Sequence, residues 1–236
     1  MLNSGKLSGL GYVYWKHVLS TLRDVIPVYD RVNKIISLGQ DNSYRYLGIS
    51  KNVRESDLIL DAGSGFGNMS SMTQKIISNN VRIIMYDPLI EMLKNSRNHL
   101  VVDSLSCGIF ENIPFKDETF DIVMCGYSLR DAINLENAIC EIHRILKKDG
   151  KFIIVDLGKP DNKIIRFGVS IYLKYILKIL AYLVARENGL KFKTLYGTYI
   201  RWPENRILNS MLKKKFSDVK YIKKMIGGSI IVSSIK

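Results

Sequence analysis

Short runs of apolar and β-branched residues alternate with helical patterns through most of this chain, and that alternation limits the folds it can adopt. Buried strands are predicted at residues 58–60, 81–85, 122–124, 151–155 and 229–232. Helices are predicted between them at residues 67–79, 88–97 and 134–147, and the last ends in a lysine-rich turn closed by Gly150. Residues 12–50 also have a helical pattern, with breaks at Pro27 and 39–42. Strands that alternate with helices favour a doubly wound, mostly parallel α/β sheet.

The chain is long and apolar enough to bury a core without disulfides, since 47% of its 236 residues are hydrophobic. Its three cysteines, Cys107, Cys125 and Cys140, form no Cys-x-x-Cys pair, which favours a reduced compartment. We expect no signal peptide, because a cationic start followed by an apolar run is absent. No stretch reaches the roughly 20 apolar residues of a membrane-spanning helix. These features predict a cytoplasmic location.

A glycine-rich segment follows the first predicted strand and opens the next helix. Residues 60–67 read LDAGSGFG, and the loop itself consists of Gly63, Ser64, Gly65, Phe66 and Gly67. Glycines let the backbone approach a ligand closely, and the following helix N-terminus offers free N–H groups. Asn68 stands where a dinucleotide fingerprint has its third glycine, and Asp61 would favour a cationic ligand. Both details favour S-adenosylmethionine over NAD, with a plain tight turn as the alternative.

An acidic residue closes the second predicted strand at a spacing typical of nucleotide sites. Asp87 lies 20 residues after Gly67, where a carboxylate can accept both hydroxyls of an adenosine ribose. Asp87 is also a good N-cap for a helix that starts at Pro88. The two roles are compatible. Together with the glycine loop, Asp87 favours a nucleotide-containing ligand.

Several motifs resemble those of the ubiquinone/menaquinone biosynthesis C-methyltransferases, from about residue 24 to the C-terminus. Residues 28–33 (VYDRVN) and 37–39 (SLG) are similar to the N-terminal signature of that family. Residues 111–115 (ENIPF) and 120–123 (FDIV) resemble its ENLPF and FD segments, and residues 126–131 (GYSLRD) its F-G-L-R-N motif. Residues 143–150 (HRILKKDG) resemble a turn common to many methyltransferases.

The resemblance implies a Rossmann-like class I methyltransferase with a seven-stranded sheet and no metal. It implies an N-terminal helical cap at residues 1–50 and a cofactor-binding core at 51–158. A helical lid at 159–202 would be inserted between strands five and six, and residues 203–236 would complete the sheet. The reaction implied is methylation of a ring carbon of a lipid quinol. S-adenosylmethionine would be the donor and S-adenosylhomocysteine the product.

The resemblance also implies the site residues. Those expected to bind the cofactor are Asp61, Gly63, Ser64, Gly65, Phe66, Gly67, Asp87, Pro88, Ile109, Phe110 and Gly126. Ile109 and Phe110 replace the Asp-Ala pair of the family, which leaves apolar packing and backbone contacts for the adenine. Tyr29, Asn33 and Tyr127 are expected to line the substrate pocket.

Arg130 and Asp131 are the candidate catalytic residues. Methylation at carbon requires stabilisation of developing phenolate charge, and Arg130 can supply it without acting as a base. Asp131 stands where the family has asparagine; it could pair with Arg130, orient it, or accept a quinol proton. A structural salt bridge between the two residues is the alternative.

Positive charge is concentrated in the last third of the chain. Residues 1–158 carry 18 basic and 18 acidic side chains, whereas residues 159–236 carry 17 basic and 4 acidic ones, so the net charge of +13 arises there. Such a segment is suited to an anionic membrane surface or to phosphate backbones. A merely solvated basic surface is the alternative.

Residues 164–185 are almost wholly apolar, but Arg166, Ser170, Lys174 and Lys178 recur every four residues. A helix with this pattern can lie in a membrane interface, and we expect it to bury there the apolar residues Ile171, Leu173, Ile176, Leu177 and Leu180. Packing on the protein's own core, or on a second copy in a homodimer, is the alternative. The charge around the segment favours a peripheral membrane enzyme.

Two other functions stay open. A nucleic-acid methyltransferase would suit the basic third, but no Asn-Pro-Pro-Tyr motif or separate RNA-binding module is visible, so nucleic acid is the less favoured partner. A cofactor-binding protein without turnover would suit the departures at Ile109 and Asp131. Another small molecule or lipid could also be the acceptor.

Overall fold

Seven strands form one sheet in the computed structural model, which describes residues 9–28, 39–77, 81–96, 100–191 and 193–236. The strand order is β3-β2-β1-β4-β5-β7-β6. Strands β1 to β5 are parallel, and β7 pairs antiparallel with both β5 and β6. The strands are β1 (Leu58–Ala62), β2 (Arg82–Asp87), β3 (Ser104–Cys107), β4 (Phe120–Gly126), β5 (Leu146–Leu157), β6 (Asp218–Lys224) and β7 (Ser229–Ile235). The predicted doubly wound, mostly parallel seven-stranded sheet is confirmed.

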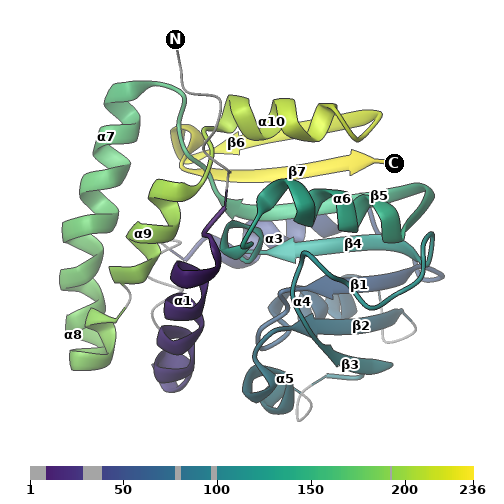
Figure 1. The fold of residues 1–236 in the computed structure, drawn as a ribbon, viewed down its shortest axis with the longest axis horizontal. Helices are drawn as coiled ribbons and strands as arrows, with labels where there is room; N and C mark the ends of the chain where they lie inside the picture. Colours follow the sequence, from purple (N-terminus) through teal and green to yellow (C-terminus); the bar gives the residue numbers. More distant parts are fainter. Residues whose placement is uncertain (1–8, 29–38, 78–80, 97–99, 192) are drawn as a thin grey trace.

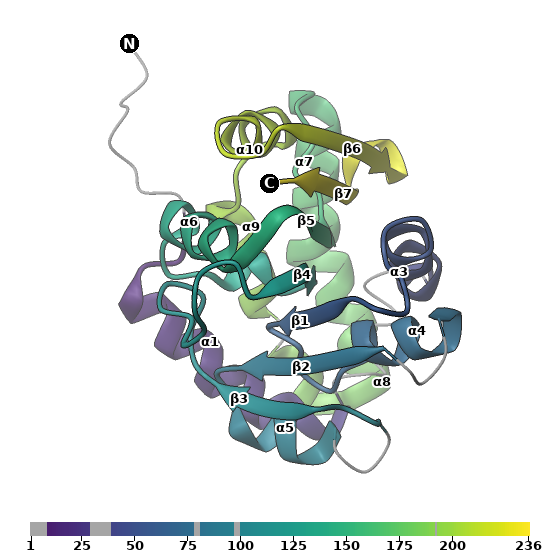
Figure 2. The same cartoon turned by 90° about the vertical axis from the view of Figure 1, so that its right-hand side faces the viewer.

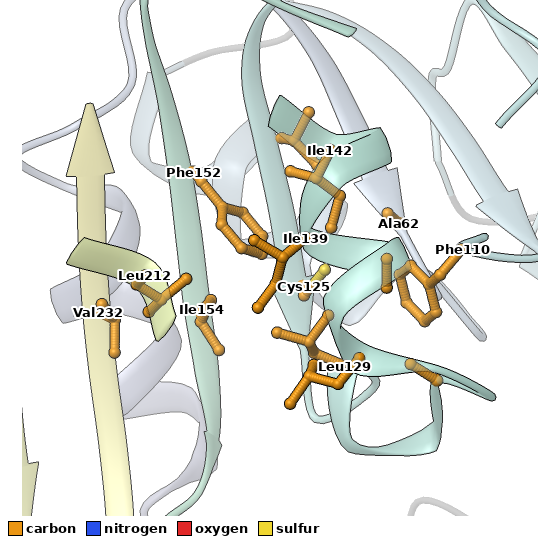
Figure 3. Packing of buried hydrophobic residues seen from close by; sticks show 14 of the residues in the cluster. Ala62, Phe110, Cys125, Leu129, Ile139, Ile142, Phe152, Ile154, Leu212 and Val232 are labelled. Carbon is orange, nitrogen blue, oxygen red and sulfur yellow. The ribbon is translucent and has the colours of Figure 1, made fainter. Parts of the chain in front are cut away.

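The central strands are apolar throughout because helices cover both of their faces. Along β5, Phe152 and Ile154 join one core cluster, while Ile153 and Val155 join the other. This alternation follows the two-residue period of a strand. Figure 3 shows the first cluster between the sheet and two helices, with Ile139 and Leu212 facing β5 and β7. These helices are α6 (Leu135–Ile145) and α10 (Asn205–Lys213).

The opposite face is covered mainly by α3 (Asp41–Ile49) and α4 (Asn68–Ile77). Tyr44, Ile49 and Met69 from these helices enter the second core cluster. Helix α5 (Ile90–Ser96) follows β2, and α1 (Tyr12–Val25) and the short turn η1 (Ile26–Val28) precede the sheet. The helical pattern predicted before residue 50 is therefore confirmed where the structure describes it.

Apolar runs in the sequence do not predict two of the seven strands, β3 and β6. β3 is four residues long and half polar, and β6 carries three lysines. Both are edge strands, which are commonly short or charged because one side is unpaired. A helix was also predicted to reach residue 147. The structure ends α6 at Ile145 and places the lysine-rich turn inside β5, where Phe120 pairs with Leu146 but Ile122 pairs with Lys151.

Three helical segments lie between β5 and α10 and form one side of the molecule (Figure 1). They are α7 (Lys163–Ile171), α8 (Leu177–Leu190) and α9 (Lys193–Arg201), with a π-helical turn, η3 (Tyr172–Ile176), joining α7 to α8. The prediction that Leu173 and Leu177 face a membrane was wrong. Both are buried against the protein, in a cluster with Leu157, Leu195 and Tyr199.

The regular cationic stripe predicted on this segment was also wrong in part. Lys174 and Lys178 are exposed, but Arg166 forms an ion pair with Glu204 at 2.7 Å. Ser170 donates its hydroxyl proton to the Arg166 carbonyl.

Leu177→Ala should lower the free energy of unfolding by about 2–4 kcal/mol, because Leu177 is 1% exposed and its removal leaves a cavity. The matched change Ile179→Ala, on the same helix but 61% exposed, should change it by less than about 0.5 kcal/mol. Denaturant unfolding of both variants measures the difference. Equal effects would show that α8 does not pack through Leu177.

Candidate functional site

A cleft lies at the carboxyl ends of β1, β2 and β4. These ends point toward α1 (Figure 1), which supplies part of the wall. Open α/β sheets bind ligands at this edge. The predicted site residues that line it are Gly63, Ser64, Gly65, Phe66, Asp87, Pro88, Ile109, Phe110, Gly126, Tyr127 and Asp131. Tyr29 and Asn33 lie outside the described residues, and Asp61, Gly67 and Arg130 are not part of the wall.

The glycine loop takes a conformation that side chains would block. Gly63, Gly65 and Gly67 have φ values of 68°, 54° and 81°, in the left-handed region that favours glycine. A Cβ on Gly63 would lie 2.4 Å from the Ser128 Cβ. The backbone N–H groups of Gly63 and Ser64 both donate to the Tyr86 carbonyl, at 2.7 and 3.1 Å. The loop is therefore fixed between the ends of β2 and β4.

Asp61 lies fully buried beneath the loop. Its Oδ2 accepts hydrogen bonds from the backbone N–H and the hydroxyl of Ser70, at 3.1 and 2.6 Å. Its Oδ1 has no hydrogen-bond partner among the described residues, and neither does the buried Oγ of Ser64. Burial raises the pKa of Asp61 to about 6, although the Ser70 hydrogen bonds lower it. A buried carboxylate oxygen without a partner suits a positively charged ligand group close by.

Asp87 connects the loop after β1 to the start of α5. Its Oδ2 accepts the N–H of Gly65 and its Oδ1 accepts the N–H of Leu89, both at 2.8 Å. The bond to Leu89 lies before α5, which begins at Ile90, so Asp87 is not the N-cap predicted for a helix starting at Pro88. Its carboxylate lines the cleft. Each oxygen retains a lone pair that can accept a ribose hydroxyl. Burial raises the pKa of Asp87 to about 6, so the carboxylate is mostly ionised at neutral pH.

The wall beside Asp87 is apolar and built from backbone-anchored residues. The Tyr86 hydroxyl donates to the Ile109 carbonyl at 2.8 Å. A Cβ on Gly108 would lie 2.2 Å from that hydroxyl, so the chain passes directly over Tyr86. Phe110 is buried and also faces the cleft. Ile109 and Phe110 therefore offer the packing surface expected for an adenine ring.

Arg130 has a buried partner that the sequence analysis did not name. Its Nη1 donates to Oδ1 of Asp156 at 2.5 Å, whereas its Nε lies 3.9 Å from Oδ1 of Asp131. Asp156 is fully buried near the end of β5. The expected salt bridge with Asp131 is therefore the longer of two. The sequence does contain a signal for this pair. Asp156 is the single acidic residue in the apolar run 152–157, and a buried charge needs a partner of opposite charge.

Asp131 is the acidic side chain at the β4 end of the cleft. Its side chain is 23% exposed. It lies four residues after Tyr127, which has a φ value of 61°. Its Oδ1 has no hydrogen-bond partner among the described residues. Burial raises the pKa of Asp131 to about 6, while Arg130 lowers it. Asp131 is therefore mostly ionised at neutral pH.

Sequence reasoning missed the wall residues that come from the N-terminal helices. These are Trp15, Leu19 and Leu22 on α1 and Arg45 on α3. Only their helical pattern was visible, since their place at the cleft depends on packing. The residues that the structure describes include no cluster of three or more metal-ligating side chains.

The residues present suit S-adenosylmethionine. The glycine cradle and Asp87 suit the nucleoside, and the apolar wall suits its base. The buried Asp61 Oδ1 and Ser64 Oγ, which no described residue hydrogen-bonds, suit the polar end of the molecule.

Comparison with known proteins identifies what the chain is similar to. The model of the ubiE/COQ5 methyltransferase family matches residues 13–236. A demethylmenaquinone methyltransferase of Lactobacillus johnsonii is 30% identical, with 98% of this chain and 97% of that protein covered. The ubiquinone/menaquinone biosynthesis C-methyltransferase UbiE of Hahella chejuensis is 25% identical, with 84% and 82% covered. The resemblance found in the sequence is confirmed.

Solved structures share the fold at lower identity. One is a chain from the complex between the Haloferax volcanii Trm112 methyltransferase activator and the putative methyltransferase. It has a TM-score of 0.64 and 15% identity, with 90% of this chain and 96% of that chain covered. An S-adenosylmethionine-dependent methyltransferase of Aquifex aeolicus has a TM-score of 0.59 and 14% identity, with 87% and 97% covered. These likenesses show a class I methyltransferase fold.

Asp87→Ala should weaken the binding of S-adenosylhomocysteine by about 1–3 kcal/mol, because a hydrogen-bonded, charged partner is lost. Titration calorimetry on the folded variant measures the change. Asp103→Ala is the control, since Asp103 lies near β3 and pairs only loosely with Arg82 at 3.7 Å. Unchanged affinity in Asp87→Ala would exclude the ribose role.

Proposed function

The chain belongs to the ubiE/COQ5 methyltransferase family, and we propose that it methylates a ring carbon of a lipid quinol with S-adenosylmethionine as donor. The names of the two relatives support this acceptor, because one specifies demethylmenaquinone and the other both ubiquinone and menaquinone biosynthesis. The single observation that carries the proposal is the cleft, where a nucleotide-type cradle lies beside the Asp131 carboxylate, whose Oδ1 has no hydrogen-bond partner in the described part of the chain.

The cofactor would be held mainly by the residues that follow β1, β2 and β3. The glycine loop at 63–67 would face its amino-acid end, Asp87 its ribose, and Ile109 and Phe110 its adenine. When bound, S-adenosylmethionine supplies a methyl group activated by a sulfonium. The residues of the cleft therefore need to bind and orient the two reactants and to take the phenol proton. The proton on the methylated ring carbon must then leave, so that the ring regains aromaticity and the oxygen is protonated again.

Asp131 and Arg130 would act on the quinol. A phenol ring carbon becomes nucleophilic when its hydroxyl is deprotonated, and Asp131 lines the cleft with a pKa of about 6. Arg130 lies 3.9 Å from the same carboxylate and is anchored by Asp156. We assign Asp131 the role of proton acceptor. Arg130 orients Asp131 and stabilises the phenolate charge. Tyr127 would border the same pocket.

The proposal is tested by incubating the protein with methyl-labelled S-adenosylmethionine and vesicles that contain a demethylated menaquinol. We expect the label on the quinone ring. Arg130→Lys should lower turnover at least tenfold with little change in affinity for S-adenosylhomocysteine, because lysine keeps the charge but loses the planar fork. Product analysis by mass spectrometry and calorimetry give the two readouts.

The controls separate this function from its alternatives. Label on RNA instead of on lipid would favour a nucleic-acid methyltransferase, and cofactor binding without any methylated product would favour a protein that has lost turnover. If Arg130→Lys loses affinity and turnover together, or unfolds, Arg130 has only a structural role with Asp156.

We further propose that the protein works while docked on a membrane. The π turn η3 and helix α8 bury Leu173, Leu177 and Ala181 in the protein, whereas α7 (Lys163–Ile171) has no buried residue. One face of this segment is apolar and exposed. Its residues are Ile164, Phe167, Ile171, Tyr175, Ile179 and Leu183. Lys174 and Lys178 flank this face and are exposed. An apolar stripe bordered by lysines suits an anionic membrane interface. A lid within residues 159–202 would admit a lipid substrate directly from the membrane.

A strained turn beside α7 extends the apolar surface. Met225 and Ile226 have φ values of 49° and 54°, and Ile226 is 77% exposed. A Cβ on Gly228 would lie 3.7 Å from Val169 of α7, which places the turn against that helix. Left-handed backbone is unfavourable for a β-branched residue, and an exposed isoleucine gains nothing from it in water. None of the helices in the described part of the chain has the length and apolarity to cross a bilayer.

Vesicle flotation tests the docking. Binding to anionic vesicles should be strong at low salt and weaken as salt rises, because the screening length shrinks. Lys174→Glu/Lys178→Glu should lower the partition coefficient at least tenfold, since each lysine near the surface contributes about 1 kcal/mol. The matched control is Lys51→Glu/Lys148→Glu, the same charge change in exposed residues outside the α7–α8 surface.

Two results would contradict docking through this surface. Equal losses in the two double variants would mean that only overall charge matters. A protein that stays off vesicles at every salt concentration and sediments as a dimer would place a second copy of the chain on the apolar face.

A further inference from the structure

Arg45 is a buried cation in the cleft that the function proposed above does not use. It lies on α3 and is 4% exposed. It is the single Lys or Arg side chain among the described residues that line the cleft. Arginine is seldom so buried unless it is paired or binds an anion.

The side chain is held in place from two directions. Its Nη1 donates to Oδ2 of Asp41, one helical turn earlier, at 2.5 Å. Its guanidinium carbon lies 5.1 Å from the centre of the Tyr127 ring, a cation–π distance. The Nε atom is buried and has no hydrogen-bond partner among the described residues. The Nε edge of a guanidinium is one that binds carboxylates with two parallel hydrogen bonds.

Asp61 is a buried acidic residue whose carboxylate can accept a further hydrogen bond. Ser70, which donates both hydrogen bonds to Asp61, lies on α4, and α4 packs against α3, the helix that carries Arg45. The charge of Arg45 also lowers the pKa of Asp61. No described residue forms a hydrogen bond with Oδ1 of Asp61. Asp61 can accept one more hydrogen bond and Arg45 can donate one more, so together they complement a ligand that carries both charges. An α-amino acid has this pattern, with an ammonium and a carboxylate on one carbon.

We propose that Arg45 binds the α-carboxylate of the methionine moiety of the cofactor, while Asp61 favours the neighbouring α-ammonium. The assignment rests on the proposed function, because it requires S-adenosylmethionine as the donor. Asp41 is then a positioning residue that holds the guanidinium ready. The quinol is a poor alternative ligand for Arg45, since its ring carries no carboxylate and its proton acceptor is Asp131.

The test compares two ligands that differ only in the carboxylate. One is S-adenosylhomocysteine, and the other is its analogue without the α-carboxyl group. Titration calorimetry on the wild-type protein should show at least tenfold tighter binding of S-adenosylhomocysteine, as expected for a charge-assisted bidentate contact. In Asp41→Asn/Arg45→Met the preference should fall to less than about threefold, because the carboxylate loses its partner while the analogue loses nothing.

The double change avoids leaving a lone buried charge, because Asp41 and Arg45 are removed together. Arg45→Lys provides a second variant that keeps the charge but not the fork, and its preference should be intermediate. Arg54→Met is the matched control, since Arg54 is exposed and does not line the cleft. Thermal melts without ligand establish that each variant is folded.

The outcomes are distinguishable. Equal affinity of the wild-type protein for the two ligands overturns the role of Arg45 and leaves the cofactor assignment intact. A parallel loss of both ligands in the double variant means that Arg45 only shapes the cleft, which also overturns it. If the wild-type protein binds neither ligand, the proposed cofactor fails, and the role of Arg45 fails with it.

Discussion

One buried carboxylate, that of Asp87, holds together the two loops from which the cleft is built. It accepts N–H groups from Gly65, after β1, and from Leu89, after β2. The parallel pairing of β1 with β2 brings the ends of both strands to the same edge. The loop can approach β4 because Gly63 has no side chain to meet Ser128. The shape of the cleft thus follows from strand register, one acid and the absence of a Cβ.

Figure 2 shows the strands between helices on both faces of the sheet, and this arrangement explains what the sequence could predict. Apolar runs reveal strands that are buried on both faces, and the glycine loop and Asp87 lie next to such strands. Arg45 reaches the cleft only because α3 packs on the sheet, and no local pattern encodes that contact. Asp156 is an intermediate case. An acid within an apolar strand indicates a buried partner, but only the fold identifies it as Arg130.

The α7–α8 segment shows why hydropathy alone does not distinguish a helix that lies in a membrane interface from one that packs on the protein core. Leu173 and Leu177 are buried in the protein, whereas Phe167 and Ile179 on other faces are exposed. The sequence has apolar residues all around the helix, so its pattern fits both environments. Tertiary contacts select one face for the core. Packing on the core accounts for Leu173 and Leu177, and the proposed docking on a membrane concerns the exposed face alone.

The charges around the cleft give a physical reason for preferring a cationic donor over its product. Four carboxyl groups there, those of Asp61, Asp87, Asp131 and Asp156, are buried or nearly so, and so are the side chains of Arg45 and Arg130. Burial raises the pKa of all four carboxyl groups, which means that their ionised forms are disfavoured by the surroundings. A sulfonium placed nearby offsets that penalty. Once the methyl group has been transferred the sulfur is neutral, so the excess of acid over base favours the donor and weakens retention of the product.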